Sequence, residues 1–469
     1  MVESKDRYEE LWIGKDKDKE SVKLNPSGML RHHTIVIGQS GSGKSFTLGR
    51  LIEEMVLHTY ARIVILDLNA DFGRLNQVNG KAWDAGNNPK LVQNLLTKEY
   101  GLDESPDNFA LTWQEECSDF LPISAVPEES SNLKISWERL TEAELRQLLG
   151  LIPFEHPEAT WLLELLTKQA KLYGWTVEQW EQIGSLVVSW SRGHFPKIDE
   201  ESQRLFGKLQ RHISMTTSVS ASQQIATSLS DALRYGIWNR TKEPTCFDKI
   251  LEQRPVTTDN LPRVTCVNLA SVSKEPARLL VVRYILDRLW NAAAEDRWQA
   301  ITQDRDNGRR PVFVVVDEVH RIASQKAEGA AEGGVLEVMR QIAAEGRKQG
   351  LLLIVATQRP SKLQSDVLSE CDNVCVMRLV SGADIKLLKE RLSFREPARL
   401  EAAKEFVTGE AIFGGEWTNG KTVWVDQVAT RRTVESGGDL PQGNFVRHVK
   451  AAERSDLSSS HSYSEEIPM

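Results

Sequence analysis

The sequence reads TIVIGQSGSGKSFTL over residues 34–48, and this stretch decides the fold class. Residues 34–37 form a short apolar run that is typical of a buried parallel strand. After a Gly/Ser loop, apolar residues recur at helical spacing from Leu48 to Val56. A second apolar run, residues 63–66, ends in Asp67. A strand, a helix and a second strand in about 35 residues indicate a βαβ unit with a right-handed crossover.

The loop after the first strand matches the pattern G-x-x-x-x-G-K-[ST], which binds phosphate groups. We expect these residues to contact the nucleotide: Gly38, Ser40, Gly41, Ser42, Gly43, Lys44, Ser45 and Phe46. The glycines let backbone N–H groups curve around a phosphate chain, and the helix N-terminus adds the positive end of its dipole. Lys44 is expected to reach the β- and γ-phosphates of ATP, and Ser45 to bind Mg²⁺ through its hydroxyl. The alternative, a glycine-rich turn with an unrelated lysine, is disfavoured by the flanking strand and helix.

Residues 312–318 read VFVVVDE, an apolar strand that ends in two carboxylates. In a chain with a phosphate-binding loop, this is the Walker B pattern. We expect Asp317 to hold the Mg²⁺ ion and Glu318 to orient or deprotonate the attacking water. A buried acidic pair is costly without a cation, which favours this interpretation over a solvent-exposed strand end.

A third apolar run covers residues 351–356, and Gln358 follows it. A glutamine at this place can donate a hydrogen bond to a phosphate oxygen and accept one from water, so it suits a γ-phosphate sensor. The alternative is a polar turn residue ahead of Pro360.

Arg347 comes after an expected helix at residues 335–344. An arginine in this place can project from the subunit edge and stabilise the transition state of a neighbouring subunit's ATP. It can equally complement the C-terminus of a helix that Gly346 caps. The spacing alone leaves both interpretations open.

The composition restricts the class of protein. The formal net charge of the 469 residues is -8, so no overall positive field attracts nucleic acid, and DNA binding needs a local surface. The five cysteines are scattered and form no CxxC pair, which indicates reduced thiols in the cytosol. Residues 1–20 lack the apolar core of a signal peptide. No stretch approaches the roughly 20 apolar residues that span a bilayer, so we expect a cytoplasmic protein without membrane contact.

The sequence pattern divides the chain into four parts. Residues 1–30 are polar and are predicted to be an N-terminal extension. Residues 31–75 and 260–440 alternate strand and helix signals, which indicates an α/β core with a mostly parallel sheet. Residues 76–259 are predicted to be a mainly helical insertion whose tryptophans are best explained as core. Residues 441–469 form a Ser-rich tail that we expect to be partly disordered.

These motifs together resemble HerA, a DNA translocase of the HerA/FtsK superfamily. The resemblance rests on four runs: LRHHT at 30–34, DE at 317–318, GRK at 346–348 and TQRP at 357–360. It covers residues 31–75 and 260–440 and implies a RecA-like P-loop core of the ASCE type with a helical insertion. It also implies a homo-hexameric ring that hydrolyses ATP with Mg²⁺ between its subunits and moves duplex DNA through its pore.

Some residues take a role only from this resemblance. Residues 67–72 correspond to an acidic motif of the family, which makes Asp71 a candidate catalytic acid; an Asx turn is the alternative. The run RRT at 431–433 looks like the segment that reaches the next subunit's nucleotide, so Arg431 and Arg432 are candidate ATP contacts in trans. A solvated basic strand end is the alternative for them. Lys326 is either a DNA contact or part of a surface loop.

One departure from the family concerns the N-terminal part. Family members usually carry a small β-barrel before the core, and too few residues precede this loop to form one, which puts pairing with the nuclease NurA in doubt. A divergent member with another nuclease or an anti-phage defence effector as partner is then expected. Two other functions stay open: a conjugation-type coupling ATPase, which normally has membrane helices, and a regulatory nucleotide switch that recruits an effector without moving DNA.

Overall fold

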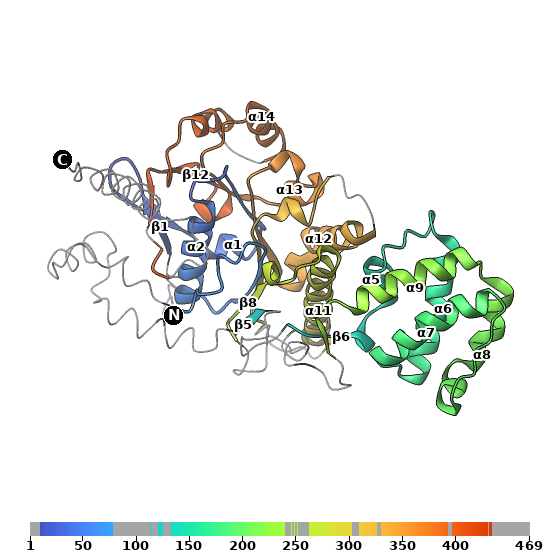
Figure 1. The fold of residues 1–469 in the computed structure, drawn as a ribbon. Helices are drawn as coiled ribbons and strands as arrows, with labels where there is room; N and C mark the ends of the chain where they lie inside the picture. Colours follow the sequence, from blue (N-terminus) through green and yellow to red (C-terminus); the bar gives the residue numbers. More distant parts are fainter. Residues whose placement is uncertain are drawn as a thin grey trace, which may run out of the picture.

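The computed structural model describes residues 10–77, 113, 121–124, 133–239, 245, 248, 251, 262–302, 309–325, 330–392, 396–429 and 431–433. In this part of the chain, a nine-stranded sheet with the order β13-β12-β11-β3-β10-β9-β4-β8-β5 forms the centre of the molecule (Figure 1). Its strands are β3 (Thr34–Ile37), β4 (Arg62–Asp67), β5 (Leu121–Ser124), β8 (Val264–Asn268), β9 (Val312–Val316), β10 (Leu351–Thr357), β11 (Asn373–Val376), β12 (Ala411–Gly414) and β13 (Val423–Val425).

The strands from β11 to β5 pair parallel with one another, whereas β12 pairs antiparallel with both β11 and β13. Every residue of β3, β4, β9 and β10 is buried, because both faces of the sheet are covered. Ile35 and Ile37 belong to the hydrophobic core on one face, and Val36 belongs to the core on the other. The expected α/β class with a mostly parallel sheet is confirmed.

Helices cover both faces of this sheet. The helix after the phosphate-binding loop, α2 (Lys44–His58), packs on one face together with the short α1 (Pro26–Met29). On the other face, α11 (Glu275–Thr302) and α12 (Ala330–Gln349) pack against each other. The remaining helices of the core are α13 (Ser365–Ser369) and α14 (Gly382–Arg391). Within the described residues, no helix is both long enough and apolar enough to cross a membrane.

The position of β10 determines where the predicted site residues meet. β10 lies between β3 and β9, with Thr357 opposite Ile37 and Val355 opposite Val316. The three strands are parallel, so their carboxyl ends lie at one edge of the sheet. The phosphate-binding loop, the Walker B carboxylates and Gln358 each follow one of these ends.

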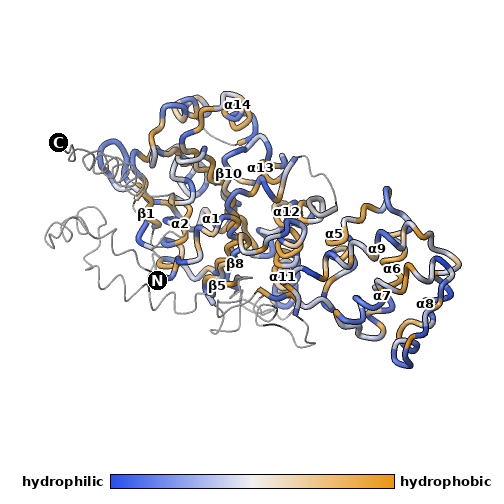
Figure 2. Tube along the Cα trace, in the orientation of Figure 1, coloured by the Kyte–Doolittle hydropathy of each residue, from blue (hydrophilic) through white to orange (hydrophobic). Residues whose placement is uncertain are grey.

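A helical lobe projects from the α11 and α12 side of the molecule (Figure 1). Its helices are α5 (Glu142–Leu148), α6 (Pro157–Tyr173), α7 (Val177–Ser191), α8 (Glu200–Thr216) and α9 (Val219–Leu233). A parallel pair of short strands, β6 (Ile135–Ser136) and β7 (Trp238–Asn239), joins the beginning and the end of the lobe. Figure 2 shows hydrophobic and hydrophilic residues alternating along these helices, as expected for amphipathic helices around a small core.

Tryptophans fill the interior of the lobe. Trp137 packs edge-on against Trp238 with ring centroids 4.6 Å apart, and Trp175 packs against Phe206 at 4.8 Å. Within the expected insertion, residues 76–259, one segment belongs elsewhere, because β5 is the edge strand of the central sheet beside β8. The insertion is therefore not entirely helical.

The polar N-terminal extension that the sequence predicted contains two strands, β1 (Leu11–Lys15) and β2 (Ser21–Leu24). With β14 (Gln427–Val428) they form a three-stranded antiparallel sheet. Leu11, Ile13, Val22 and Leu24 are buried in the core that also contains the apolar face of α2. The sequence analysis did not predict these strands, because β1 pairs with a segment from the other end of the core. Residues 16–20 form the turn between β1 and β2. Lys326 and the tail at 441–469 lie outside the described residues.

Candidate nucleotide-binding site

The phosphate-binding loop has the backbone geometry that its glycines allow. Gly41 and Gly43 have φ angles of 73° and 96°, which side chains disfavour, and Gly43 is the N-cap of α2. The loop is fixed by the segment that follows β11, because the Gln39 N–H donates to the carbonyl oxygen of Arg378 at 2.9 Å. The Thr408 hydroxyl donates to the carbonyl of Gly41 at 2.9 Å. The N-terminus of α2 therefore faces a preformed turn, as phosphate binding requires.

Lys44 lies on the carboxylates of the Walker B strand. Its Nζ is 3.0 Å from Asp317 Oδ1 and 2.8 Å from Glu318 Oε1. Burial alone would lower the pKa of Lys44, but the negative charges of Asp317 and Glu318 outweigh burial and raise it. The ammonium group therefore stays charged and can exchange its carboxylate partners for phosphate oxygens.

Ser45 and Asp317 are placed to share a cation. The Ser45 hydroxyl donates to Asp317 Oδ2 at 2.8 Å, and the Asp317 side chain is buried. A second carboxylate, Asp67 at the end of β4, is also buried. Burial raises the pKa of Asp67, and the negative charge of Asp317 raises it further. Hard oxygen ligands in a region of buried negative charge suit Mg²⁺, which takes few protein ligands and completes its shell with water and phosphate. Ser45 and Asp317 thus fit the ion that the sequence predicted.

Glu318 is held in an unusual conformation at the end of β9. Its φ of 53° lies in the left-handed region, which non-glycine residues adopt only where the surroundings enforce it. Its Oε2 lies 3.1 Å from His320 Nδ1 and 3.4 Å from the backbone N–H of Gln358. Burial would raise the pKa of Glu318, but the hydrogen bond to His320 and the charge of Lys44 outweigh it and hold the pKa at about 2. Glu318 is therefore ionised and able to accept a hydrogen bond from water.

His320 is a site residue that the sequence analysis missed. Its Nδ1 also lies 3.1 Å from Thr357 Oγ1, and that oxygen accepts a hydrogen bond from the Arg359 N–H at 3.0 Å. A hydrogen on Nδ1 can be donated to the Glu318 carboxylate, whereas a lone pair there would repel it, so we assign the hydrogen to Nδ1. The signal in the sequence was the position of His320, two residues after Glu318 in the turn that follows the strand.

Gln358 follows β10 at the same edge and is half-buried. Its backbone N–H points to Glu318 Oε2, and the preceding residue, Thr357, contacts His320. The strand end that was predicted to carry a phosphate sensor is therefore in contact with the predicted base. Phe46, half-buried in the first turn of α2, is beside this site in the sequence, and its role in binding remains a prediction.

Arg347 lies at the opposite edge of the sheet. It is exposed in the last turn of α12, just before β10 begins at the amino edge. β10 has seven residues, so at ~3.3 Å per residue Arg347 is about 23 Å from the carboxyl edge. The proposed cap was wrong: α12 continues through Gly346 to Gln349, and Gly350, with φ 79°, follows it. Gly346 is required for a different reason, because a Cβ there would lie 2.4 Å from the carbonyl oxygen of Leu351.

Arg431 and Arg432 lie in the interior rather than in solvent. Both are at most 4% exposed, so the alternative of a solvated basic strand end is wrong for this chain. The backbone N–H of Arg432 donates to Glu53 on α2, and the Arg431 guanidinium lies 5.3 Å from the ring centroid of Phe72. Glu53 is nine residues beyond Lys44, or about 14 Å along the helix. The structure does not bring these arginines to the nucleotide site of their own chain.

Asp71 lies in the turn after β4, at the same edge as the Walker B residues. Its backbone N–H donates to Asp67 Oδ1 at 3.0 Å, and the N–H of Phe72 donates to Asp67 Oδ2 at 2.9 Å. The side chain that organises this turn is therefore that of Asp67, not that of Asp71. A catalytic role for Asp71 remains a prediction.

Comparison with known proteins identifies related families. Residues 11–289 match the family model described as "Helicase HerA, central domain", and residues 263–379 match the AAA model, "ATPase family associated with various cellular activities". The chain is 22% identical over 408 residues to the DNA double-strand break repair helicase HerA of Pyrococcus furiosus, which covers 83% of this chain and 65% of that protein. It is 28% identical over 156 residues to the protein of the same name from Sulfolobus acidocaldarius, covering 33% and 30%. The chain thus spans less than two thirds of the length of these relatives.

Two solved structures align with most of this chain at low identity. The bacterial conjugative coupling protein TrwB superposes with a TM-score of 0.48 at 14% identity, over 89% of this chain and 90% of that one. VirB4 of Thermoanaerobacter pseudethanolicus superposes with a TM-score of 0.45 at 13% identity, over 90% and 96%.

Proposed function

Because this chain belongs to the family of the HerA helicase central domain, we propose that it is an ATP-hydrolysing motor subunit that moves DNA as part of a ring. The observation that carries the proposal is the carboxyl edge of the sheet. There, Glu318 lies within hydrogen-bond reach of Lys44 and His320, and Asp317 contacts Ser45. These are the groups that phosphoryl transfer to water requires: a phosphate cradle, metal ligands and a base.

Each residue has a separate task in hydrolysis. Bound Mg²⁺, held by Ser45 and Asp317, would neutralise charge on the phosphates. Lys44 leaves the carboxylates to bind the β- and γ-phosphates of ATP, which frees one oxygen of Glu318. His320 keeps the other oxygen of Glu318 in place, so that the free oxygen orients the attacking water and accepts its proton. Gln358 donates a hydrogen bond to the γ-phosphate, so that the presence of this phosphate affects the position of the end of β10.

The position of Arg347 supports an assembly in which ATP lies between subunits. This arginine is too far from its own phosphate-binding loop to stabilise the transition state there, and it is exposed at the other edge of the sheet. Head-to-tail contacts that close produce a ring in which one subunit's edge faces the next subunit's site. We propose a homo-hexamer with duplex DNA in its pore, with Arg347 acting on the neighbour's ATP and Arg431 and Arg432 in the segment that contacts the next subunit. A nuclease or a defence effector would then act on the DNA that the ring moves.

The test is steady-state ATP hydrolysis by the wild type and Glu318→Gln, with and without duplex DNA, together with the mass in solution. We expect a ring-sized species whose hydrolysis is stimulated by DNA, and a ~10²–10⁴-fold lower rate in Glu318→Gln with nucleotide binding retained. Slow hydrolysis that does not respond to DNA would contradict the motor and favour the nucleotide switch.

A second arm tests catalysis between subunits. The Lys44→Ala variant loses nucleotide binding but keeps Arg347. The Arg347→Ala variant loses the arginine but keeps nucleotide binding. Co-expressed mixed rings of the two variants should hydrolyse ATP faster than either variant alone, because some sites combine an intact loop with an intact arginine. A rate no higher than the sum of the two single variants would contradict the role of Arg347.

A further inference from the structure

Helix α8 (Glu200–Thr216) lies at the end of the helical lobe that is farthest from the ATPase core (Figure 1). Its buried face consists of Phe206, Leu209 and Ile213, which belong to the core of the lobe. Asp199 caps the helix by accepting a hydrogen bond from the Ser202 N–H at 2.7 Å. Burial and capping thus fix which side of α8 faces solvent.

The exposed face of α8 carries three cations in line. Arg204, Lys208 and Arg211 follow one another at spacings of four and three residues, and all three are exposed. These spacings place them on one side of the helix over about 10 Å of its length. The acids of this helix, Glu200 and Glu201, lie in its first turn, one helical turn before Arg204 and farther from Lys208 and Arg211.

Among the described residues, none of the three cations of α8 is within 4.0 Å of a carboxylate, a property that they share with other exposed basic residues such as Lys171, Arg192 and Lys197. Elsewhere, Lys168 pairs with Glu164 at 2.5 Å and Lys404 pairs with Glu401 at 2.7 Å, each one helical turn away. In a chain with a formal net charge of -8, an unneutralised basic face is a local site for a polyanion.

An aromatic surface adjoins the basic face. The ring of His212, also exposed on α8, stacks on Trp161 of α6 with centroids 6.2 Å apart and an angle of 21° between the planes. Trp161 is 39% exposed, and Met215 in the last turn of α8 is 78% exposed. Cations beside a flat aromatic side chain favour nucleic acid, because the sugar or base can contact the ring while the phosphates bind the cations. An acidic protein surface could pair with the cations, but its carboxylates would make no specific contact with the aromatic ring.

We propose that the α8 face formed by Arg204, Lys208 and Arg211 binds the phosphodiester backbone of DNA at a site outside the ATPase core. This inference rests on the proposed motor function, to which it adds a second DNA contact, carried by the helical lobe. Three cations match about three phosphates, so the contact should contribute about 2.7 to the slope of log K against log salt concentration on duplex DNA, and less on a single strand.

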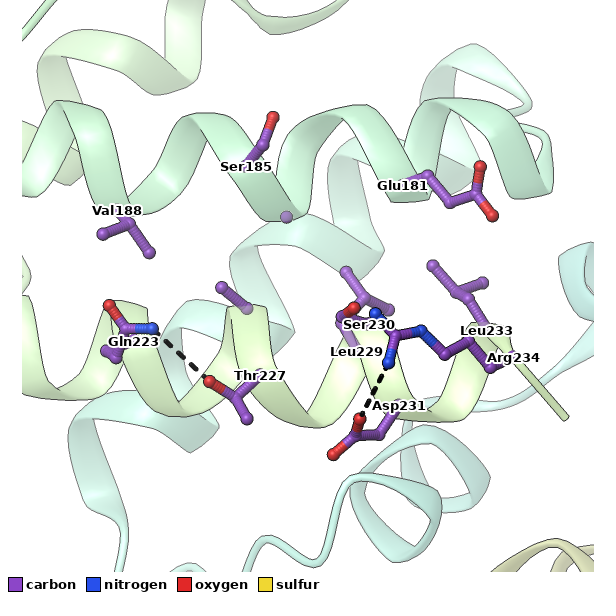
Figure 3. A pocket seen from close by; sticks show the side chains of 12 residues that line it. Glu181, Ser185, Val188, Gln223, Thr227, Leu229, Ser230, Asp231, Leu233 and Arg234 are labelled. Atoms are coloured by element: carbon purple, nitrogen blue, oxygen red, sulfur yellow. Dashed lines mark hydrogen bonds and ion pairs between the residues drawn. The ribbon is translucent and has the colours of Figure 1, made fainter.

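The groove between α7 and α9 in the same lobe offers a matched control (Figure 3). Arg234 at the end of α9 is exposed as well, but it lies 4.0 Å from Asp231, and at the other end of the groove Gln223 donates to Thr227 at 3.4 Å. These contacts stay within one helix. Arg234→Gln therefore removes one exposed positive charge from the lobe without touching the face of α8.

The experiment compares the full-length wild type, the triple variant Arg204→Gln/Lys208→Gln/Arg211→Gln and the control Arg234→Gln. Fluorescence anisotropy measures binding to labelled duplex and single-stranded DNA over a range of salt concentrations. We expect the triple variant to bind at least ~10-fold more weakly and to lose about 2.7 of the salt slope on duplex DNA. The control should bind like the wild type, and both variants should keep the wild-type unfolding midpoint and the wild-type ATP hydrolysis without DNA.

The outcomes separate this inference from the proposed function. Unchanged affinity and salt slope in the triple variant overturn the α8 site, whatever DNA does to ATP hydrolysis. Wild-type binding that poly-glutamate competes away but excess DNA does not also overturn it, since the face would then belong to an acidic protein. Weakened DNA binding in the triple variant, in a chain whose ATP hydrolysis ignores DNA, supports the α8 site and contradicts the motor. Which DNA loses more affinity distinguishes a duplex site from a single-strand site.

Discussion

The two edges of the central sheet both contain buried charged or polar groups, and the two sets are built differently. At the carboxyl edge, Lys44 contacts two carboxylates, and those carboxylates also contact Ser45 and His320. Asp317 and Glu318 share Lys44 as a cation, and each has one further side-chain partner, Ser45 or His320. When a nucleotide binds, Lys44 can therefore exchange the carboxylates for phosphate oxygens, and the carboxylates keep their other partners.

Toward the amino edge, where α2 runs back along the sheet, the carboxylates are bound by fixed backbone groups of the same chain. Glu53 accepts hydrogen bonds from the backbone N–H groups of Arg432 and Thr433 and from the Thr433 hydroxyl at 2.7 Å. Arg50 lies 3.3 Å from Glu53 and is also paired with Glu54, whose other oxygen accepts the Trp12 N–H. Backbone N–H groups, which cannot move away from the carboxylates, supply several of these hydrogen bonds. Charged side chains that share partners, as at the carboxyl edge, can exchange them when a ligand binds. Charged side chains that bind backbone N–H groups, as at the amino edge, stabilise the fold.

The strongest test of this contrast is Glu53→Ala. The change leaves the backbone N–H groups of Arg432 and Thr433 without their buried acceptor and removes one of the two carboxylates that pair with Arg50. We therefore expect the free energy of unfolding to fall by about 3–5 kcal/mol. Urea unfolding measures it. Glu164→Ala, which breaks the exposed pair with Lys168, is the control and should stay within about 0.5 kcal/mol. A loss in Glu53→Ala as small as that of the control would show that the amino-edge cluster is not a closed unit.

A second prediction for the amino edge concerns how the stability of the protein depends on pH through the buried His33. Burial lowers the pKa of His33 to about 4 from its ordinary 6.5, although the hydrogen bond to the Ala343 carbonyl raises it. Between pH 6.5 and 4 the unfolded chain binds a proton that the folded chain does not, so stability falls as pH decreases. The loss reaches about 3 kcal/mol at pH 4. Unfolding midpoints of the wild type should therefore decrease more steeply over this range than those of His33→Asn. The exposed His194→Asn is the control, and parallel curves for His33→Asn and the wild type would refute the assignment.

The prediction with the smallest expected effect concerns the carboxyl edge and the role of His320 in ATP hydrolysis. Without His320, Glu318 keeps only Lys44 and the Gln358 N–H as partners, so its carboxylate should be held less firmly for the attacking water. We expect His320→Ala to lower the rate at saturating ATP by ~10-fold, with ATP affinity unchanged.

His320→Asn provides the conservative variant, because its side-chain amide can replace the Nδ1 hydrogen-bond donor. Recovery of part of the rate in His320→Asn would support positioning of Glu318. An equal loss in both variants, or a weaker ATP affinity in either, would contradict it.

The catalytic edge was largely predictable from the sequence, and the amino edge was not. The strands at 34–37 and 312–316 have the predicted bounds, because continuous apolar runs identify buried parallel strands. Lys44, Asp317 and Glu318 follow these strands directly, so local patterns were sufficient to bring them together.

The other contacts depend on pairs that are distant in the sequence. β1 is short and pairs with β14, and Glu53 is paired with a segment near residue 432, so no local periodicity marks either contact. His320 was missed for a similar reason, since its second partner, Thr357, is 37 positions away. The end of α12 was misplaced because Gly346, which looks like a cap, is needed for close packing inside the helix.

The contact between Glu53 and Arg432 spans 379 positions of the chain. At a synthesis rate of about 5–20 residues per second, Glu53 would leave the ribosome about 20–75 s before its partner. During that time α2 and the phosphate-binding loop can form local structure, but the charges on the far half of α2 have no buried partner. Contacts of such high sequence separation are slow to close. The nascent chain therefore completes the support of its nucleotide site only as one of the last steps of folding.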